Sequence, residues 1–260
     1  MFHWFELLTA ELRRSWIQFI RYPIEALISV AIITIVFYGL FLGARYMAGP
    51  GMDFGDRLDT IVIGYVLWSL VIYVVNDIAL GLQQEAQTGT LEQVFLSPFG
   101  APQVFMARAI ASLTLRMVIV LLTLLIIMGL TGSQIQFPPS LFLPLFTLLG
   151  AAYGLSFLMG AFALLVKQVQ QLLGLAQFFL LFVIATPTQN WTGTMALFSH
   201  LLPMVPSAKL LRDVMARGQG LSEPELAIAF TNGLIYLLLG LFAFHWAEQQ
   251  AKQRDLLSGY

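Results

Sequence analysis

Two charged side chains lie inside long apolar runs of this 260-residue chain, which makes them candidates for a functional role. Asp77 lies near the end of the second apolar run and Arg116 near the start of the third. A charge inside a lipid bilayer is costly, so such residues pair with one another or bind an ion or a substrate. We place Asp77 about one and a half turns from the end of its helix and Arg116 about two turns into the next. We expect an ion pair across neighbouring helices; ion or substrate binding is the alternative.

The segment between these two runs carries the signals of a short helix. Thr90 is expected to be its N-cap, and Gln93 three residues later completes a capping box. Glu92 falls in the first turn, where the helix dipole favours an anion, and Pro98 ends the helix. Three apolar residues share one face by their spacing, and we expect a partner protein to dock on that face: Leu91, Val94 and Phe95.

The loop pattern Glu-x-x-x-Gly-Thr-Leu-Glu-Gln followed by Ser-Pro resembles the cytoplasmic loop of type-2 ATP-binding-cassette (ABC) transporter permeases. In that family a coupling helix within the loop sits in a groove of a separate ATPase subunit. Ala86 and Gln87 replace the Arg and Glu that the family has at these positions. The alternative is a capped surface helix without a partner. The candidate ATPase-coupling residues are Glu85, Gly89, Thr90, Leu91, Glu92, Val94 and Phe95.

The composition is that of a membrane protein. Of all residues 58% are hydrophobic and only 10% are charged, and the mean hydropathy is +0.82. A span needs about 20 apolar residues. Six runs are long enough, and they are Ile24–Ala44, Thr60–Leu82, Ala109–Leu130, Leu141–Val166, Val169–Pro187 and Leu226–Trp246. The sequence therefore predicts an all-α polytopic fold with six transmembrane helices.

Lys and Arg residues near the span ends indicate the orientation. Arg13, Arg14, Arg21, Arg108, Lys167, Lys252 and Arg254 fall on one side, against Arg45, Arg57, Lys209, Arg212 and Arg217 on the other. This bias predicts that both termini and the coupling loop, residues 83–108, lie in the cytoplasm. We expect a multi-pass protein of the cytoplasmic (inner) membrane.

The segments on either side of the permease domain, residues 24–246, have different characters. Residues 1–23 show apolar side chains at helical spacing with charged residues beside them, which predicts an amphipathic helix in the membrane interface, broken at Pro23. A plain membrane anchor and a helix that also contacts the ATPase, as the resemblance implies, both remain open. Residues 247–260 are expected to form a cytoplasmic tail.

The outer segment, residues 187–217, is too apolar for a solvated loop and too broken by proline to cross the membrane twice. It resembles the outer re-entrant hairpin of the same family. An ordinary interfacial loop is the alternative. Its marker residues are Pro187, Pro203, Pro206 and Arg212.

Several functions are excluded by what the sequence lacks. Without cysteine, no disulfide or zinc–cysteine site is possible, and the three histidines stand at no metal-ligand spacing. No Gly-Lys-Ser/Thr is present for a P-loop, so ATP and Mg are expected on a separate ATPase subunit, with no cofactor and no metal on this chain. A net charge of -1 gives no attraction to nucleic acid.

The resemblance implies a permease subunit of an ABC exporter, itself not an enzyme, that works with membrane lipid around it and with a second permease copy, as a homodimer or heterodimer. A lipid, a glycan or a hydrophobic small molecule would each suit as substrate. Two rival classes remain: a secondary transporter driven by an ion gradient, with Asp77 as its coupling site, and an intramembrane enzyme, for which no convergent set of acid, base or metal ligands is visible.

Overall fold

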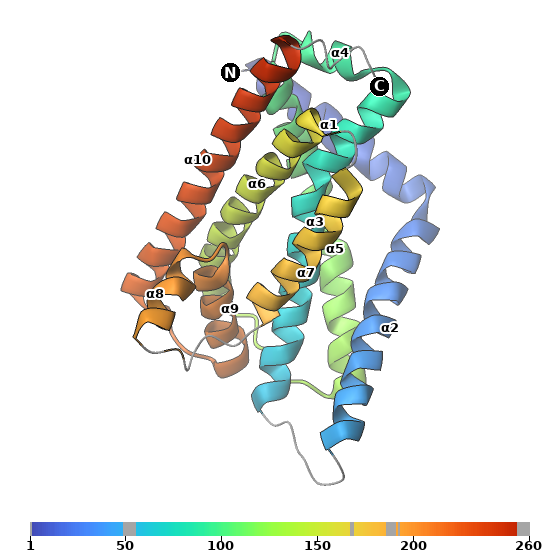
Figure 1. Cartoon of the computed structure of the whole chain (residues 1–260). Coiled ribbons are helices and arrows are strands. Elements are labelled where there is room, and N and C mark those ends of the chain that lie inside the picture. Colours follow the sequence, from blue (N-terminus) through green and yellow to red (C-terminus); the bar gives the residue numbers. More distant parts are fainter. Residues whose placement is uncertain (1, 49–55, 167–168, 186–190, 192, 254–260) are drawn as a thin grey trace.

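The computed structural model describes residues 2–48, 56–166, 169–185, 191 and 193–253, and every regular element among them is a helix. Figure 1 shows a bundle of long, roughly parallel helices with short helices at both ends. The elements are α1 (Phe2–Arg21), α2 (Pro23–Ala48), α3 (Asp56–Thr88), α4 (Leu91–Phe95), α5 (Ala101–Thr131), the 3-10 turn η1 (Pro139–Leu141), α6 (Phe142–Leu165), α7 (Val169–Ala185), α8 (Thr194–Leu201), α9 (Val205–Arg217) and α10 (Glu223–Gln253).

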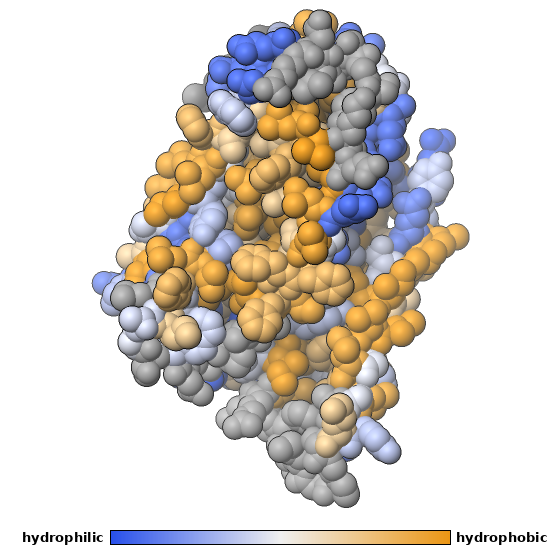
Figure 2. All heavy atoms as spheres, viewed as in Figure 1, coloured by the Kyte–Doolittle hydropathy of each residue, from blue (hydrophilic) through white to orange (hydrophobic). Residues whose placement is uncertain are grey.

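The predicted all-α polytopic membrane fold is confirmed. Five helices of the described chain, α2, α3, α5, α6 and α10, are long and apolar enough to cross a bilayer. The sixth predicted span is α7, whose 17 residues extend about 25 Å and so lie at the lower limit for a span. Apolar side chains cover the middle of the bundle in Figure 2, as contact with lipid requires.

Different helices lie at the two ends of the bundle (Figure 1). α1 and α4 lie at one end, together with the end of α10, while α8 and α9 lie at the other. α1 stops at Arg21 and α2 begins at Pro23, where the sequence predicted a break. α10 continues to Gln253, beyond the predicted span end at Trp246, and Glu248 and Lys252 pair one turn apart at 2.8 Å on this extension.

The predicted outer segment forms two short helices joined by a tight turn. Met204, the residue before α9, has a positive φ of 66°. Its N–H donates to Asn232 of α10, and the Asn232 amide in turn donates to the carbonyl oxygens of His200 and Leu202 at 2.9 and 3.1 Å. One buried amide thus satisfies the polar backbone of the whole turn, as an apolar environment demands.

Most of α9 is buried against α3, α6 and α10. Pro203 and Pro206 are buried at its start, and Arg212 is 2% exposed and donates to the carbonyl of Ile184 in α7. Pro187 lies outside the described residues. The segment is therefore a packed helical hairpin rather than a solvated loop.

α6 and α10 pack backbone to backbone through glycine. A Cβ on Gly240 would collide with the backbone of Gly154, and one on Gly154 with the backbone of Tyr236. Gly233 makes a similar approach, since its Cβ would stand 2.7 Å from the carbonyl oxygen of Thr147. The backbones of α6 and α10 therefore lie closer together than larger side chains at these positions would allow.

We predict that Gly240→Ala lowers the melting temperature of the detergent-solubilised protein, because neither backbone can move without separating α6 from α10. Overpacking of this kind costs about 3 kcal/mol. Gly129→Ala in α5 is the matched control, since its Cβ would meet nothing within 4 Å, and it should leave the melting temperature unchanged or raised. Equal melting temperatures for the two variants would contradict the close-packed interface.

Candidate functional site

The turn that follows α3 depends on Gly89. Its φ of +72° is a left-handed conformation, which terminates α3 in the way glycine commonly does. The N–H groups of Gly89 and Thr90 then donate to the carbonyl oxygens of Ala86 and Glu85 at 3.2 and 3.0 Å. Because these bonds close the end of α3, α4 begins at a defined angle to it.

The predicted capping box at Thr90 is wrong. Thr90 precedes α4, but its side chain makes no capping bond to that helix. Its hydroxyl instead donates to the carboxylate of Glu85 and lies 2.8 Å from the hydroxyl of Thr88. The end of α3 brings an ionised acceptor within reach, and a carboxylate attracts the hydroxyl proton more strongly than neutral groups do.

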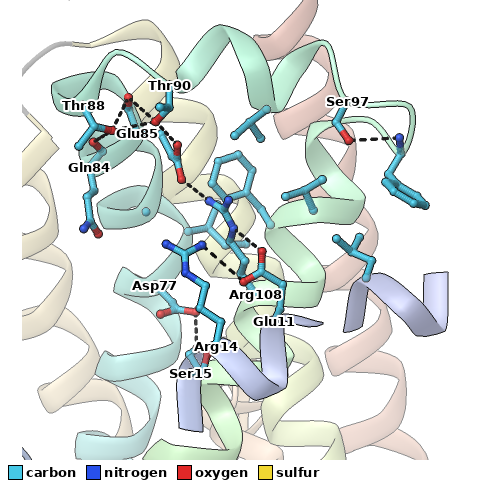
Figure 3. Close-up of a pocket in the computed structure, with 18 of the residues that line it drawn as sticks. Glu11, Arg14, Ser15, Asp77, Gln84, Glu85, Thr88, Thr90, Ser97 and Arg108 are labelled. Carbon is cyan, nitrogen blue, oxygen red and sulfur yellow. Dashed lines mark hydrogen bonds and ion pairs between the residues drawn. The ribbon is translucent and has the colours of Figure 1, made fainter. Parts of the chain in front are cut away.

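Arg108 is the hub of an ion-pair network below this turn (Figure 3). Its guanidinium donates to Glu85 of α3 at 2.5 Å and to Glu11 of α1 at 3.0 Å. The two carboxylates are only 15% and 13% exposed, and Arg14 approaches Glu11 from α1 at 3.7 Å. The network therefore ties α1, the end of α3 and the start of α5 to one another, and it reaches the α4 turn through Thr90.

The predicted docking face of α4 points inward. Leu91, Val94 and Phe95 are at most 8% exposed and belong to the protein core, so they hold α4 on its own bundle. Lys252 from the end of α10 lies over the ring of Phe95 at 5.7 Å. The outward residues of the α4 segment are Glu92, Gln93 and Leu96, the last 82% exposed. We call these three residues the α4 outer face; Gln93, although exposed, also lines the edge of a cavity beneath this helix.

The predicted ion pair of Asp77 with Arg116 is replaced by two separate contacts. Asp77 accepts a hydrogen bond from Ser112 at 2.6 Å. The guanidinium of Arg116 lies over the ring of Tyr73 at 4.4 Å, and the described residues include no salt bridge between it and Asp77. Both residues line one cavity of about 860 Å³ beneath α4, between α1, α3 and α5.

Sequence reasoning missed Glu11 and Asn232. Glu11 is one of several charges on the polar side of α1, and no local pattern shows that α1 crosses the start of α5. Asn232 is a polar residue in an apolar run, the signal that singled out Asp77, and the same criterion would have found it.

The described residues thus form a membrane-spanning helical bundle with a short helix, α4, at one end. The chain belongs to the ABC-2 type transporter family, because the model of that family matches residues 6–216. It is therefore a multi-pass integral membrane protein and a permease subunit of an ABC transporter. Members of this family work with an ABC ATPase subunit. No match was found among curated proteins.

We predict that Arg108→Gln lowers the melting temperature, because it leaves Glu11 and Glu85 close together without their shared cation. The loss should be about 2 kcal/mol, between the values for exposed and buried ion pairs. Adding Glu85→Gln to that variant should recover part of the loss, and Arg14→Gln, at a side chain 64% exposed, should change little. Strictly additive losses in the double variant would argue against the network.

Proposed function

We propose that this chain is the membrane subunit of an ATP-driven exporter, and that α4 is the coupling helix on which a separate ATPase subunit docks. The observation that carries the proposal is the division of α4 into two faces. Its apolar face is buried in the bundle, while Glu92, Gln93 and Leu96 are exposed at the end of the molecule. A helix held this way receives force outside and transmits it inward.

The Arg108 network supports the transmission step. A displacement of α4 would be transmitted to the end of α3 through the Gly89 turn, and to α1 and α5 through Arg108. Since packed helices move as units rather than deform continuously, the stroke would displace these helices together. ATP binding and hydrolysis in the partner would then open the path outward for a lipid, a glycan or a hydrophobic small molecule.

We infer that two permease copies work together, as a homodimer or heterodimer, because the family resemblance implies it. α2, with only 17% of its apolar window buried in this chain, leaves a surface that lipid or the second copy would cover. We also infer that α1, α4 and the end of α10 face the cytoplasm, because Arg13, Arg21 and Lys252 belong to α1 and to the end of α10. We propose the cytoplasmic (inner) membrane as the location of the protein.

We predict that the chain co-purifies in detergent with an ABC ATPase encoded beside it, and that the pair hydrolyses ATP. The measurement is co-elution on a sizing column followed by an ATPase assay. Transport by the purified chain alone under an ion gradient would favour the secondary-transporter class instead.

We predict that Glu92→Lys lowers substrate-stimulated ATP hydrolysis of the reconstituted complex by about tenfold, the effect of losing about 1.4 kcal/mol of contact. Leu96→Asp should act similarly, because it puts a charge into the centre of the proposed contact. Insertion should be normal, since both side chains are exposed.

Glu223→Lys is the matched control for that experiment. It reverses the same charge on an exposed residue at the opposite end of the bundle, the start of α10. Its hydrolysis should equal that of the unaltered protein. Full stimulated activity in both Glu92→Lys and Leu96→Asp would mean that α4 is only a connection.

A further inference from the structure

The cavity beneath α4 continues toward the membrane. A second cavity of about 400 Å³ lies between α1, the start of α2 and α5. The two share four lining residues, Ser15, Gln18, Ser112 and Arg116, so they adjoin one another and are treated as two parts of one space. The volume of the larger part lies in the range of about 300–1,000 Å³ that small-molecule sites occupy.

Both parts of this space have polar and apolar walls. The part beneath α4 carries most of the charged residues, together with apolar side chains such as Val94 and Phe105. The part beside α2 combines Leu115 and Ile119 with polar residues such as Glu25. Only 17% of the apolar window of α2 is buried, so this part lies beside a helix that faces lipid. A ligand with a charged group beneath α4 and an apolar chain directed toward α2 suits both parts.

The polar groups at the junction retain bonding capacity. Arg116 has a cation–π contact with Tyr73 and, within the described residues, makes no hydrogen bond through its guanidinium. Asp77 accepts one hydrogen bond, from Ser112. Ser112 and Arg116 are four residues apart on α5, about 6 Å along the axis, so the Arg116 guanidinium and the carboxylate bound by Ser112 border the same cavity.

The charge balance favours a ligand with both signs of charge. Three arginines line the two cavities, Arg14, Arg108 and Arg116, against four carboxylates, Glu11, Glu25, Asp77 and Glu85. Because the lining has no excess of positive charge, a bare anion gains little there. A zwitterion offers its phosphate to Arg116 and its ammonium to Asp77.

We propose that this space binds the headgroup of a zwitterionic phospholipid-type amphiphile from the inner leaflet, with phosphate at Arg116 and amine at Asp77. Two carbon atoms between phosphate and amine, as in phosphoethanolamine, suit groups held one helical turn apart. If the chain is the proposed exporter, such an amphiphile is its substrate class. Binding does not depend on that function; only transport does. Thr90 and Gln93 line the same cavity, so an occupied site contacts the coupling loop.

The test measures binding to the detergent-solubilised full chain without any ATPase, by native mass spectrometry. Three probes separate the contributions of the chain and of the amine. Lysophosphatidylethanolamine has both, glycerophosphoethanolamine has the same headgroup but no chain, and lysophosphatidylglycerol has the chain and phosphate but no amine. We expect the first to bind at least about tenfold more tightly than the other two, which corresponds to about 1.4 kcal/mol.

Two variants locate the site. Arg116→Gln should weaken binding of lysophosphatidylethanolamine about tenfold, while Arg116→Lys keeps the positive charge and should keep most of the affinity. Asp77→Asn should abolish the preference over lysophosphatidylglycerol, a change that a purely structural role would not produce. Arg13→Gln is the control, because Arg13 is exposed on α1 and lines neither of the two cavities.

Three results would overturn the proposal. Equal binding of the chainless headgroup would show a water-soluble ligand, equal binding of lysophosphatidylglycerol would remove the role of the amine, and unchanged binding in Arg116→Gln would place the lipid elsewhere. The comparison of probes on the unaltered protein decides the matter even where a variant fails to fold. Since no ATPase is present, a failure here is separate from a failure of coupling at α4.

Discussion

The shared guanidinium of Arg108 is the interaction on which the end of the bundle that carries α1 and α4 depends. It holds a carboxylate from α1 and a carboxylate from α3 on one side chain of α5. Three charges with little exposure stabilise a structure only when each is satisfied, and removing one leaves the others uncompensated. The same group orients Glu85 toward Thr90, so the loop that carries α4 is set by an ion pair formed between distant parts of the chain.

At the other end of the bundle, the main requirement is to satisfy the backbone hydrogen bonds of a buried turn. There the chain turns between α8 and α9 beside apolar helices, and its backbone groups need partners that water does not supply. Asn232 and Tyr236 of α10 provide them, with the Tyr236 hydroxyl donating to Leu201 at 2.8 Å. Because α10 also packs through glycine on α6, the outer hairpin and the central helices are held as one body, while α10 reaches Phe95 at the far end through Lys252. This single helix thus joins both ends.

Length and hydropathy were enough to predict the long helices, since a span must be apolar whatever it packs against. The break at Pro23 and the short α4 helix also followed from local signals. The exposed face of α4 could not be predicted from local signals. The spacing of Leu91, Val94 and Phe95 defines an apolar face, but it does not say whether the chain itself or a partner covers that face. Asp77 and Arg116 line one cavity, but the ion pair predicted between them is replaced by contacts with Ser112 and Tyr73. These contacts depend on helix rotation, which hydropathy does not specify.

Docking of the ATPase on the α4 outer face can be tested directly, because the sequence contains no cysteine. Single variants Gln93→Cys and Leu96→Cys, labelled with a photoactivatable maleimide, should cross-link to the ATPase subunit in the assembled complex. The same label on Glu223→Cys, at the opposite end, should yield none. Cross-linking from residue 223 with none from residues 93 and 96 would contradict the account.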